Sequence, residues 1–192
     1  AAALCGSQEE VLAEYADMVC LGTVADVMPL QGENRVFVTR GLTSLQNTHR
    51  PGIAALMAEV GCTPDSVSAS TIGYSIAPRL NAAGRLGQAK IAADLLMSTS
   101  PASSDALARE LCELNRQRQN IETEIWKEAS ALIEGTRPDC PIVLASDRWH
   151  QGVIGIAASR LAEQYSLPAI MICLSDGVGK GYLNRPELTA EK

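Results

Sequence analysis

The sequence predicts an α/β protein in which a helical first part is joined by one long helix to a β-α-β unit. Two observations carry this prediction. The first is a helical pattern that runs without a break over residues 101–134, and the second is a succession of apolar strand, amphipathic helix and apolar strand between residues 141 and 174. The composition, 46% hydrophobic and 20% charged in 192 residues, is typical of a globular chain that can bury a core.

The first element is a predicted helix from Val11 to Asp26, which Pro29 ends. Its apolar stripe consists of Val11, Leu12, Tyr15, Met18, Val19 and Gly22. Residues 34–39 follow, and their sequence favours a short strand or an extended link.

Arg50-Pro51-Gly52 then opens a helix that runs through Val60, with Gly61 as its stop signal. Residues 63–71 are rich in Ser, Thr and Pro, which predicts a loop. A polar turn should precede another helix over residues 90–97.

The long helix is the clearest prediction. Ser100 is a suitable N-cap, Pro101 suits the first helical position, and Gly135 closes the far end. Its apolar positions are Leu107, Leu111, Leu114, Ile121, Ile125 and Leu132. At 1.5 Å per residue such a helix extends about 50 Å, so we expect it to connect two lobes.

The β-α-β unit comprises a strand over 141–146, a helix over 152–165 and a strand over 169–174. Such a unit normally forms a parallel strand pair. Alone it is too small for a finished domain, so the second lobe is expected to be incomplete.

Composition narrows the class of protein. The six cysteines form no Cys-x-x-Cys pair, which favours reduced, buried thiols in a cytoplasmic protein over a metal site or a disulfide framework. No apolar run is long enough to span a bilayer, so no membrane partner is expected. The net charge of -6 argues against a generally basic nucleic-acid coat but leaves room for a local basic groove.

Asp26 is the first candidate for chemistry. If its helix runs that far, stepping back by helical intervals reaches Gly22, Val19 and Tyr15, so the carboxylate would lie on a buried apolar face. A buried carboxylate must be paired, capped or bound to a metal. The alternative is that Asp26 caps a turn before Pro29.

The second candidate is the segment from Ala77 to Leu86, which contains Arg79, Asn81 and Arg85. No Asp or Glu occurs between Ser66 and Ala93, so this is a positive island in an acidic chain. Arginines, an asparagine and a glycine in a turn are suited to phosphate contacts. The alternative is a solvated loop with structural arginines.

The third candidate is His150, between the first strand of the β-α-β unit and its helix. Backbone N–H groups at a helix N-terminus attract anions, and Gly152 would let the backbone come close. A lone loop histidine can equally be a surface or capping residue. The chain shows no catalytic triad, zinc spacing or nucleotide-binding glycine motif, and one carboxylate cannot hold a two-metal site.

Taken together, these segments resemble the RecJ family of single-stranded-DNA-specific exonucleases, within the DHH phosphoesterase superfamily. The matching stretches span residues 11 to 181 and are Leu21-Gly-Thr-Val-Ala-Asp-Val-Met-Pro-Leu30, Arg50-Pro-Gly-Ile53, Ile76-Ala-Pro-Arg-Leu-Asn-Ala-Ala-Gly-Arg-Leu86, Leu114-Asn115 with Arg118-Gln119, and Trp149-His-Gln-Gly-Val-Ile-Gly-Ile156. The Arg-Leu-Asn-Ala-Ala-Gly-Arg run is the stretch that points to this family within the superfamily.

The resemblance implies 5′ to 3′ hydrolysis of single-stranded DNA in repair and recombination, with Mn²⁺ or Mg²⁺ in a site between two lobes. Asp26 would be a catalytic metal ligand, Arg79, Asn81 and Arg85 would line the DNA path, and His150 would face the phosphates. Repair or replication proteins would be further partners; the oligomeric state is left open.

The resemblance also implies a division of the chain. Residues 1–46 would end a DHH-type catalytic lobe, 47–99 would be a helical segment with a basic DNA-path loop, 100–135 the connecting helix, and 136–192 the start of a truncated second lobe. The family's other metal-binding motifs have no counterpart here, and residues 182–192 do not match its phosphate-binding segment. We therefore expect these 192 residues to be inactive alone.

Two other interpretations stay open at this stage. One is a different DHH phosphoesterase that acts on short oligonucleotides or cyclic dinucleotides. The other is a catalytically dead DHH-like protein that serves as a replication scaffold.

Overall fold

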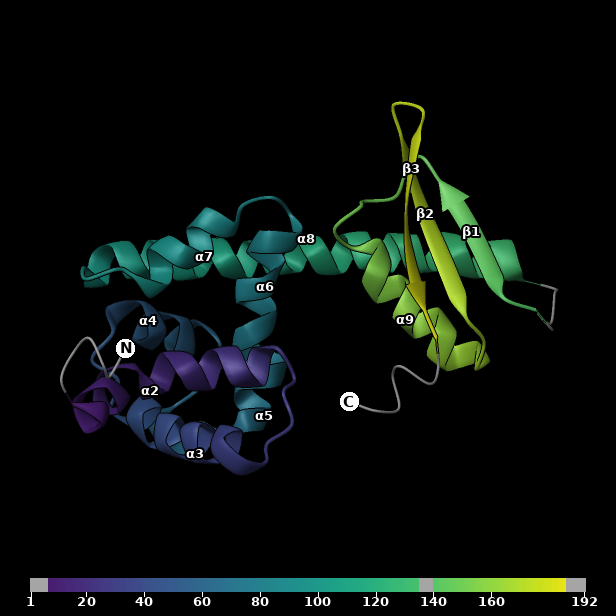
Figure 1. Cartoon of the computed structure of the whole chain (residues 1–192). Coiled ribbons are helices and arrows are strands. Elements are labelled where there is room, and N and C mark those ends of the chain that lie inside the picture. The colour runs from purple at the N-terminus through teal and green to yellow at the C-terminus, as the bar shows by residue number, and fades with distance from the viewer. Residues whose placement is uncertain (1–6, 135–139, 186–192) are drawn as a thin grey trace. The chain divides into compact units, whose positions relative to one another are not determined.

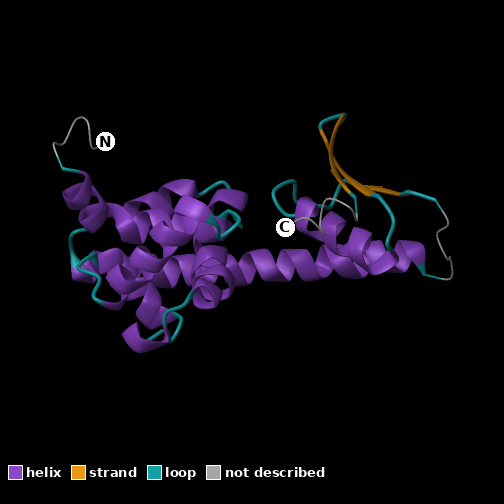
Figure 2. Cartoon of the chain, turned by 60° about the horizontal axis from the view of Figure 1, so that its bottom comes forward, coloured by secondary structure: helices purple, strands orange, loops and turns teal. Residues whose placement is uncertain are grey.

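The computed structural model describes residues 7–134 and 140–185 (Figure 1). It is a mixed α/β fold, mostly helical, which confirms the predicted class. The chain divides into two compact units, Ala1–Gly84 with Gln88–Asn115, and Arg85–Gly87 with Arg116–Lys192. Strands occur only in the second unit among the described residues (Figure 2). None of the helices in the described ranges is long and apolar enough to cross a membrane.

The first unit is built from helices. They are α2 (Gln8–Ala25), α3 (Gly32–Gln46), α4 (Pro51–Glu59), η1 (Pro64–Ser66), α5 (Ala69–Thr71), the π-helical turn η2 (Ile72–Ile76), α6 (Ala77–Arg85) and α7 (Ala89–Leu96). Helices α4 and α7 approach closely at Gly52, where a Cβ atom would lie 1.8 Å from the carbonyl oxygen of Leu95. Gly52 is therefore a packing residue of the Arg50-Pro-Gly-Ile53 stretch.

The predicted strand or link over residues 34–39 is wrong, because these residues lie within α3. The run Val36-Phe37-Val38 has high strand propensity, but tertiary packing overrides it. The buried positions of α3 are Val38, Gly41 and Leu45, whose spacings of three and four residues are helical.

The predicted buried stripe of α2 is also wrong in phase. Tyr15 and Val19 are exposed, and the buried residues are instead Ala16, Asp17, Cys20 and Leu21. These four residues also have helical spacing, but one of them is an aspartate. A prediction that looks only for apolar residues therefore selects the neighbouring face of the helix.

Two segments predicted as loop or turn are helical. Within residues 63–71 lie η1 and α5, and Arg79, Asn81 and Arg85 lie on α6 rather than in a loop. By contrast, the helices predicted after Arg50 and over residues 90–97 are confirmed as α4 and α7. Gly61 follows α4 with a positive φ of 69°, as a helix stop signal should.

The long helix is confirmed as α8, Pro101–Ile133, with 33 residues. Its residues up to Asn115 belong to the first unit and those from Arg116 to the second. Leu132 is exposed and Ile133 is buried, so the buried face of the last turn lies one position beyond the predicted one. Gly135 lies outside the described residues.

The second unit contains β1 (Ile142–Ser146), α9 (Ile154–Tyr165), β2 (Ala169–Ser175) and β3 (Val178–Asn184). The predicted parallel pair is confirmed, with Ile142 opposite Ala169 and Ser146 opposite Cys173. One core joins the end of α8, α9 and the inner face of the sheet, where Trp149, Val153, Ile154, Leu161 and Met171 are buried.

Strand β3 was not predicted. It pairs antiparallel with β2 through a two-residue turn, Asp176-Gly177, in which both residues have positive φ. Residues 182–184, which do not match the family's phosphate-binding segment, are thus part of the sheet; residues 186–192 lie outside the described ranges.

The five described cysteines are free thiols, as expected. Cys20, Cys62 and Cys173 are buried, whereas Cys112 is half-buried and Cys140 is exposed, so the prediction of burial fails for these two. Cys5 lies outside the described residues.

Candidate functional site

Asp26 lies at the C-terminal end of α2, where it is the C-cap residue and is exposed to solvent. Its backbone N–H donates to the carbonyl of Gly22, 3.0 Å away. The prediction that its carboxylate lies on a buried face is therefore wrong, and the alternative of a residue at the helix-ending turn describes its position. An exposed carboxylate at this point can be reached by an ion.

The turn after Asp26 is strained. Val27 has a φ of 55°, a left-handed conformation that is rare for a β-branched residue. The Val27 N–H donates to Val24 and the Met28 N–H donates to Thr23, each over 3.1 Å, so this turn closes the helix in the manner usually formed by glycine. Strain of this kind costs about 1–3 kcal/mol and is concentrated at functional sites.

A buried ion pair that the sequence did not predict anchors α2. Asp17 is 1% exposed, and its Oδ2 accepts from Nε of Arg50 over 2.9 Å. The Arg50 guanidinium also donates to the carbonyl of Glu14 and lies over the Tyr15 ring, 5.6 Å from its centroid. Arg50 of the Arg-Pro-Gly-Ile stretch therefore has a structural partner in Asp17. The sequence contained one sign of this pair, because Asp17 has helical spacing to the apolar residues Cys20 and Leu21.

The same cluster sets the protonation of a thiol. Burial raises the pKa of Cys20 to about 11, and the nearby Asp17 carboxylate contributes to that rise. The Cys20 thiol lies 3.6 Å from the carbonyl oxygen of Val38, to which it donates. Cys20 is thus a neutral core residue and not a nucleophile at ordinary pH.

Arg79 and Asn81 lie on α6 within the first unit. Nη1 of Arg79 donates to the carbonyl of Ser75 over 2.6 Å, and its Nε is buried without a hydrogen-bond partner among the described residues. Asn81 is exposed. Arg79 is therefore partly engaged by its own helix, while the Asn81 amide faces solvent.

Arg85 and the His150 loop are brought together in the second unit. Nη1 of Arg85 donates to the carbonyl of Gly152 over 3.2 Å. A Cβ atom at Gly152 would lie 2.0 Å from the carbonyl oxygen of Arg85. We expected Gly152 to let the backbone approach an anion; the close approach in the structure is to Arg85.

His150 is half-buried in the turn that leads into α9. Its Nδ1 accepts from the N–H of Gly152 over 3.1 Å, so a neutral ring carries its proton on Nε2, which is then a donor. Trp149 before it is buried in the core, and the carbonyl of Trp149 accepts from the Cys173 thiol over 2.9 Å. The loop is therefore fixed on both sides of the imidazole.

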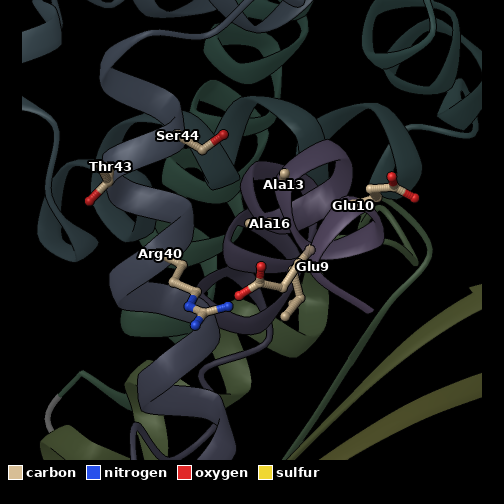
Figure 3. Close-up of a pocket in the computed structure, with 8 residues that line it drawn as sticks. Glu9, Glu10, Ala13, Ala16, Arg40, Thr43 and Ser44 are labelled. Atoms are coloured by element: carbon tan, nitrogen blue, oxygen red, sulfur yellow. The ribbon is translucent and has the colours of Figure 1, made fainter. Parts of the chain in front are cut away.

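A groove of about 580 Å³ lies between α2 and α3 (Figure 3). It is lined by Glu9, Glu10, Leu12, Ala13, Ala16, Arg40, Thr43 and Ser44. The Arg40 and Glu9 side chains point toward one another across it. It contains none of the predicted site residues, so this groove does not mark the candidate site.

The metal donors of the chain are few. Within residues 7–134 and 140–185, no group of three or more His, Cys, Asp or Glu side chains could hold a metal ion. Asp26 fits as one oxygen ligand of a hard divalent cation, and a site with three or more such side chains would need donors from outside these ranges.

The chain is similar in sequence to exonucleases that are specific for single-stranded DNA. The chain is 40% identical over 183 residues to a single-stranded-DNA-specific exonuclease of Dickeya dadantii (strain 3937), which covers 92% of this chain and 32% of that protein. It is 38% identical over 171 residues to one of Bacillus subtilis (strain 168), which covers 88% of this chain and 22% of that protein. No family model matches.

Both of these exonucleases are named RecJ, and the fold agrees. A crystal structure of RecJ from Thermus thermophilus in complex with Mn²⁺ superimposes with a TM-score of 0.81 at 37% identity, covering 90% of this chain and 25% of that one. A second crystal structure from the same organism, in complex with Mg²⁺, gives a TM-score of 0.79. The similarity to RecJ is thereby confirmed, and the chain spans a third or less of the length of the relatives it matches.

Proposed function

We propose that the chain is a section of a RecJ-like exonuclease that hydrolyses the phosphodiester bonds of single-stranded DNA. The observation that carries this proposal is the 40% identity over 92% of the chain to an exonuclease of that specificity. The geometry supports it, because Asp26, Asn81 and Arg85 are exposed and His150 is half-buried. We further propose 5′ to 3′ polarity, a role in DNA repair and recombination, and a cytoplasmic location.

Asp26 would be a ligand of Mn²⁺ or Mg²⁺, the two ions present in the RecJ crystal structures. Carboxylate oxygens are the ligands that such hard cations prefer. A bound divalent cation would polarise the phosphodiester and activate water. The positive φ of Val27 next to Asp26 supports this assignment, since strained backbone positions cluster at functional sites.

The proposed DNA-contacting roles rest on hydrogen-bond donors of His150, Arg85 and Asn81. His150 Nε2 would donate to a phosphate oxygen, and the Gly152 N–H fixes the ring in the tautomer that can do so. Arg85 would present its remaining guanidinium N–H groups to the DNA backbone while Nη1 binds Gly152. Asn81 would contact the backbone from α6, and Arg79 would support that helix and add positive charge.

The test is Asp26→Asn in the full-length protein. We expect Mn²⁺-dependent release of nucleotides from 5′-labelled single strands to fall by about a thousandfold or more, because a neutral amide is a poor ligand for a hard cation. The matched control is Asp65→Asn, which changes an exposed aspartate of the same unit and should leave the rate unchanged.

Two outcomes would contradict the proposal. Full activity of the Asp26→Asn protein would remove Asp26 from the metal site. Hydrolysis of cyclic dinucleotides by the wild type in preference to long single strands would indicate a different phosphoesterase. The 192 residues alone should show no activity in the same assay, because the described residues hold no complete metal site.

A further inference from the structure

We propose that Tyr74 is a base-stacking residue on the single-stranded-DNA path, an inference that rests on the proposed function and names a residue not assigned above. Tyr74 is 84% exposed, more than any other large apolar or aromatic side chain in the described ranges. Within the described ranges, an aromatic ring this open to water gains nothing from core packing. Such a ring is a candidate for contact with a ligand that presents flat apolar faces.

The helix holds Tyr74 outward. It lies in the π-helical turn η2 between Ile72 and Ile76, which are both buried. A residue two positions from each of them lies on the opposite side of the helix. The burial of the two isoleucines therefore fixes the exposure of Tyr74. Short π-helical turns within helices are rare and frequently occur at functional sites.

The surroundings of Tyr74 favour an anionic polymer. No acidic residue occurs between Ser66 and Ala93. Arg79 reaches back along the helix, and its Nη1 lies 2.6 Å from the carbonyl oxygen of Ser75, the residue next to Tyr74. A cation thus binds the residue next to the aromatic ring, and the exposed Asn81 follows seven positions after Tyr74 in the same acid-free stretch.

An aromatic platform beside a cation is the arrangement by which proteins bind single strands without reading their sequence. Unpaired bases can offer a free face for stacking, whereas inside a duplex both faces of each base are covered by neighbouring base pairs. Tyr74 would therefore contribute to selection of single-stranded over double-stranded DNA. The Asp26 site acts on the phosphodiester and cannot make that distinction by charge alone.

The test measures DNA binding by the full-length protein without metal, so that hydrolysis does not interfere. The ligands are a fluorescent oligothymidine and an abasic deoxyribose-phosphate strand of the same length. Tyr74→Ala should weaken binding to oligothymidine by about fivefold to a hundredfold and leave binding to the abasic strand unchanged. Tyr74→Trp and Tyr74→Phe should retain binding, because both rings stack.

Tyr74→Leu separates stacking from packing against protein, since leucine keeps the apolar bulk but has no ring. Loss of oligothymidine binding by Tyr74→Leu supports stacking, and retention overturns it. The matched control is Met97→Ala, at a side chain of the same unit that is 81% exposed and should have no effect. Equal losses on the abasic strand would also overturn the proposal.

Hydrolysis and binding assays together separate the stacking role of Tyr74 from the exonuclease function. If the wild type hydrolyses single strands and Tyr74→Ala binds like Met97→Ala, the stacking role is wrong and the function stands. If the wild type neither binds nor hydrolyses single strands, both are wrong.

Discussion

The two units hold their candidate residues by different means. In the first unit, Asp26 ends a helix that is anchored farther back by a buried ion pair between Asp17 and Arg50. In the second unit, His150 lies in a loop that is tied to Arg85 through Gly152 and rests on an apolar core. The first arrangement depends on charge compensation and the second on close backbone fit, so they should fail under different substitutions.

Arg50→Met is the substitution with the largest expected effect on stability, and it acts on the first unit. It leaves the Asp17 carboxylate buried without its partner, which should lower the free energy of unfolding by about 3–5 kcal/mol. Urea unfolding followed by circular dichroism measures this loss. Both tryptophans, Trp126 and Trp149, belong to the second unit, so their fluorescence reports that unit separately.

Lys90→Met is the matched control, because the Lys90–Asp94 pair is exposed and should contribute less than about 1 kcal/mol. Pairing Arg50→Met with Asp17→Leu should recover much of the stability, since no buried charge then remains. A loss of less than about 1 kcal/mol in Arg50→Met would show that charge compensation does not hold the first unit.

Gly152→Ala tests the second unit in the same way. The new Cβ atom would lie 2.0 Å from the Arg85 carbonyl oxygen, and relieving that overlap should cost about 3 kcal/mol. The tryptophan fluorescence transition should shift to lower urea. Gly84→Ala is the control, because no atom lies within 4 Å of its Cβ position and alanine favours the helix by up to about 1 kcal/mol.

The smallest expected effect is the pH dependence of stability that the buried Cys20 thiol gives to the first unit. The Cys20 pKa of about 11 in the folded chain lies above the ordinary thiol value of 9.0. The unfolded chain therefore loses its thiol proton first as the pH rises, and stability is lost between about pH 9 and pH 11. Up to about 2 kcal/mol should disappear over this range in the wild type but not in Cys20→Ala. An equal slope in both proteins would contradict the assignment.

The elements that could be predicted from the sequence are those with strong, uninterrupted periodicity. Helix α8 and the β1-α9-β2 unit are confirmed, because their apolar positions recur over many residues or alternate with clear breaks. Helix α3 was missed because Val36-Phe37-Val38 has strand propensity, whereas the helix packs against α2 and buries Val38. Strand β3 was missed because its residues are mostly exposed, although Asp176-Gly177 is a recognisable hairpin turn.

The identity of the candidate site residues stays a prediction, whereas their environment can be compared with the structure. Asp26, Asn81, Arg85 and His150 are accessible to different degrees, yet Asp26 was placed on the wrong side of α2. Spacing could not show that Arg85 and the His150 loop meet, because 65 positions separate the two residues and only the fold brings them together. The Asp17–Arg50 pair was missed for the same reason.

The contact between Arg85 and Gly152 has a consequence for dissecting the protein. The second unit is discontinuous in sequence, because it consists of Arg85–Gly87 and the residues from Arg116 onward. Leu86 packs against its core, next to the Arg85 contact. A shortened gene that begins at Arg116 would delete both residues and leave an unfilled space in the core. To express the second unit alone, residues 85–87 should be joined by a short linker to the segment that begins at Arg116.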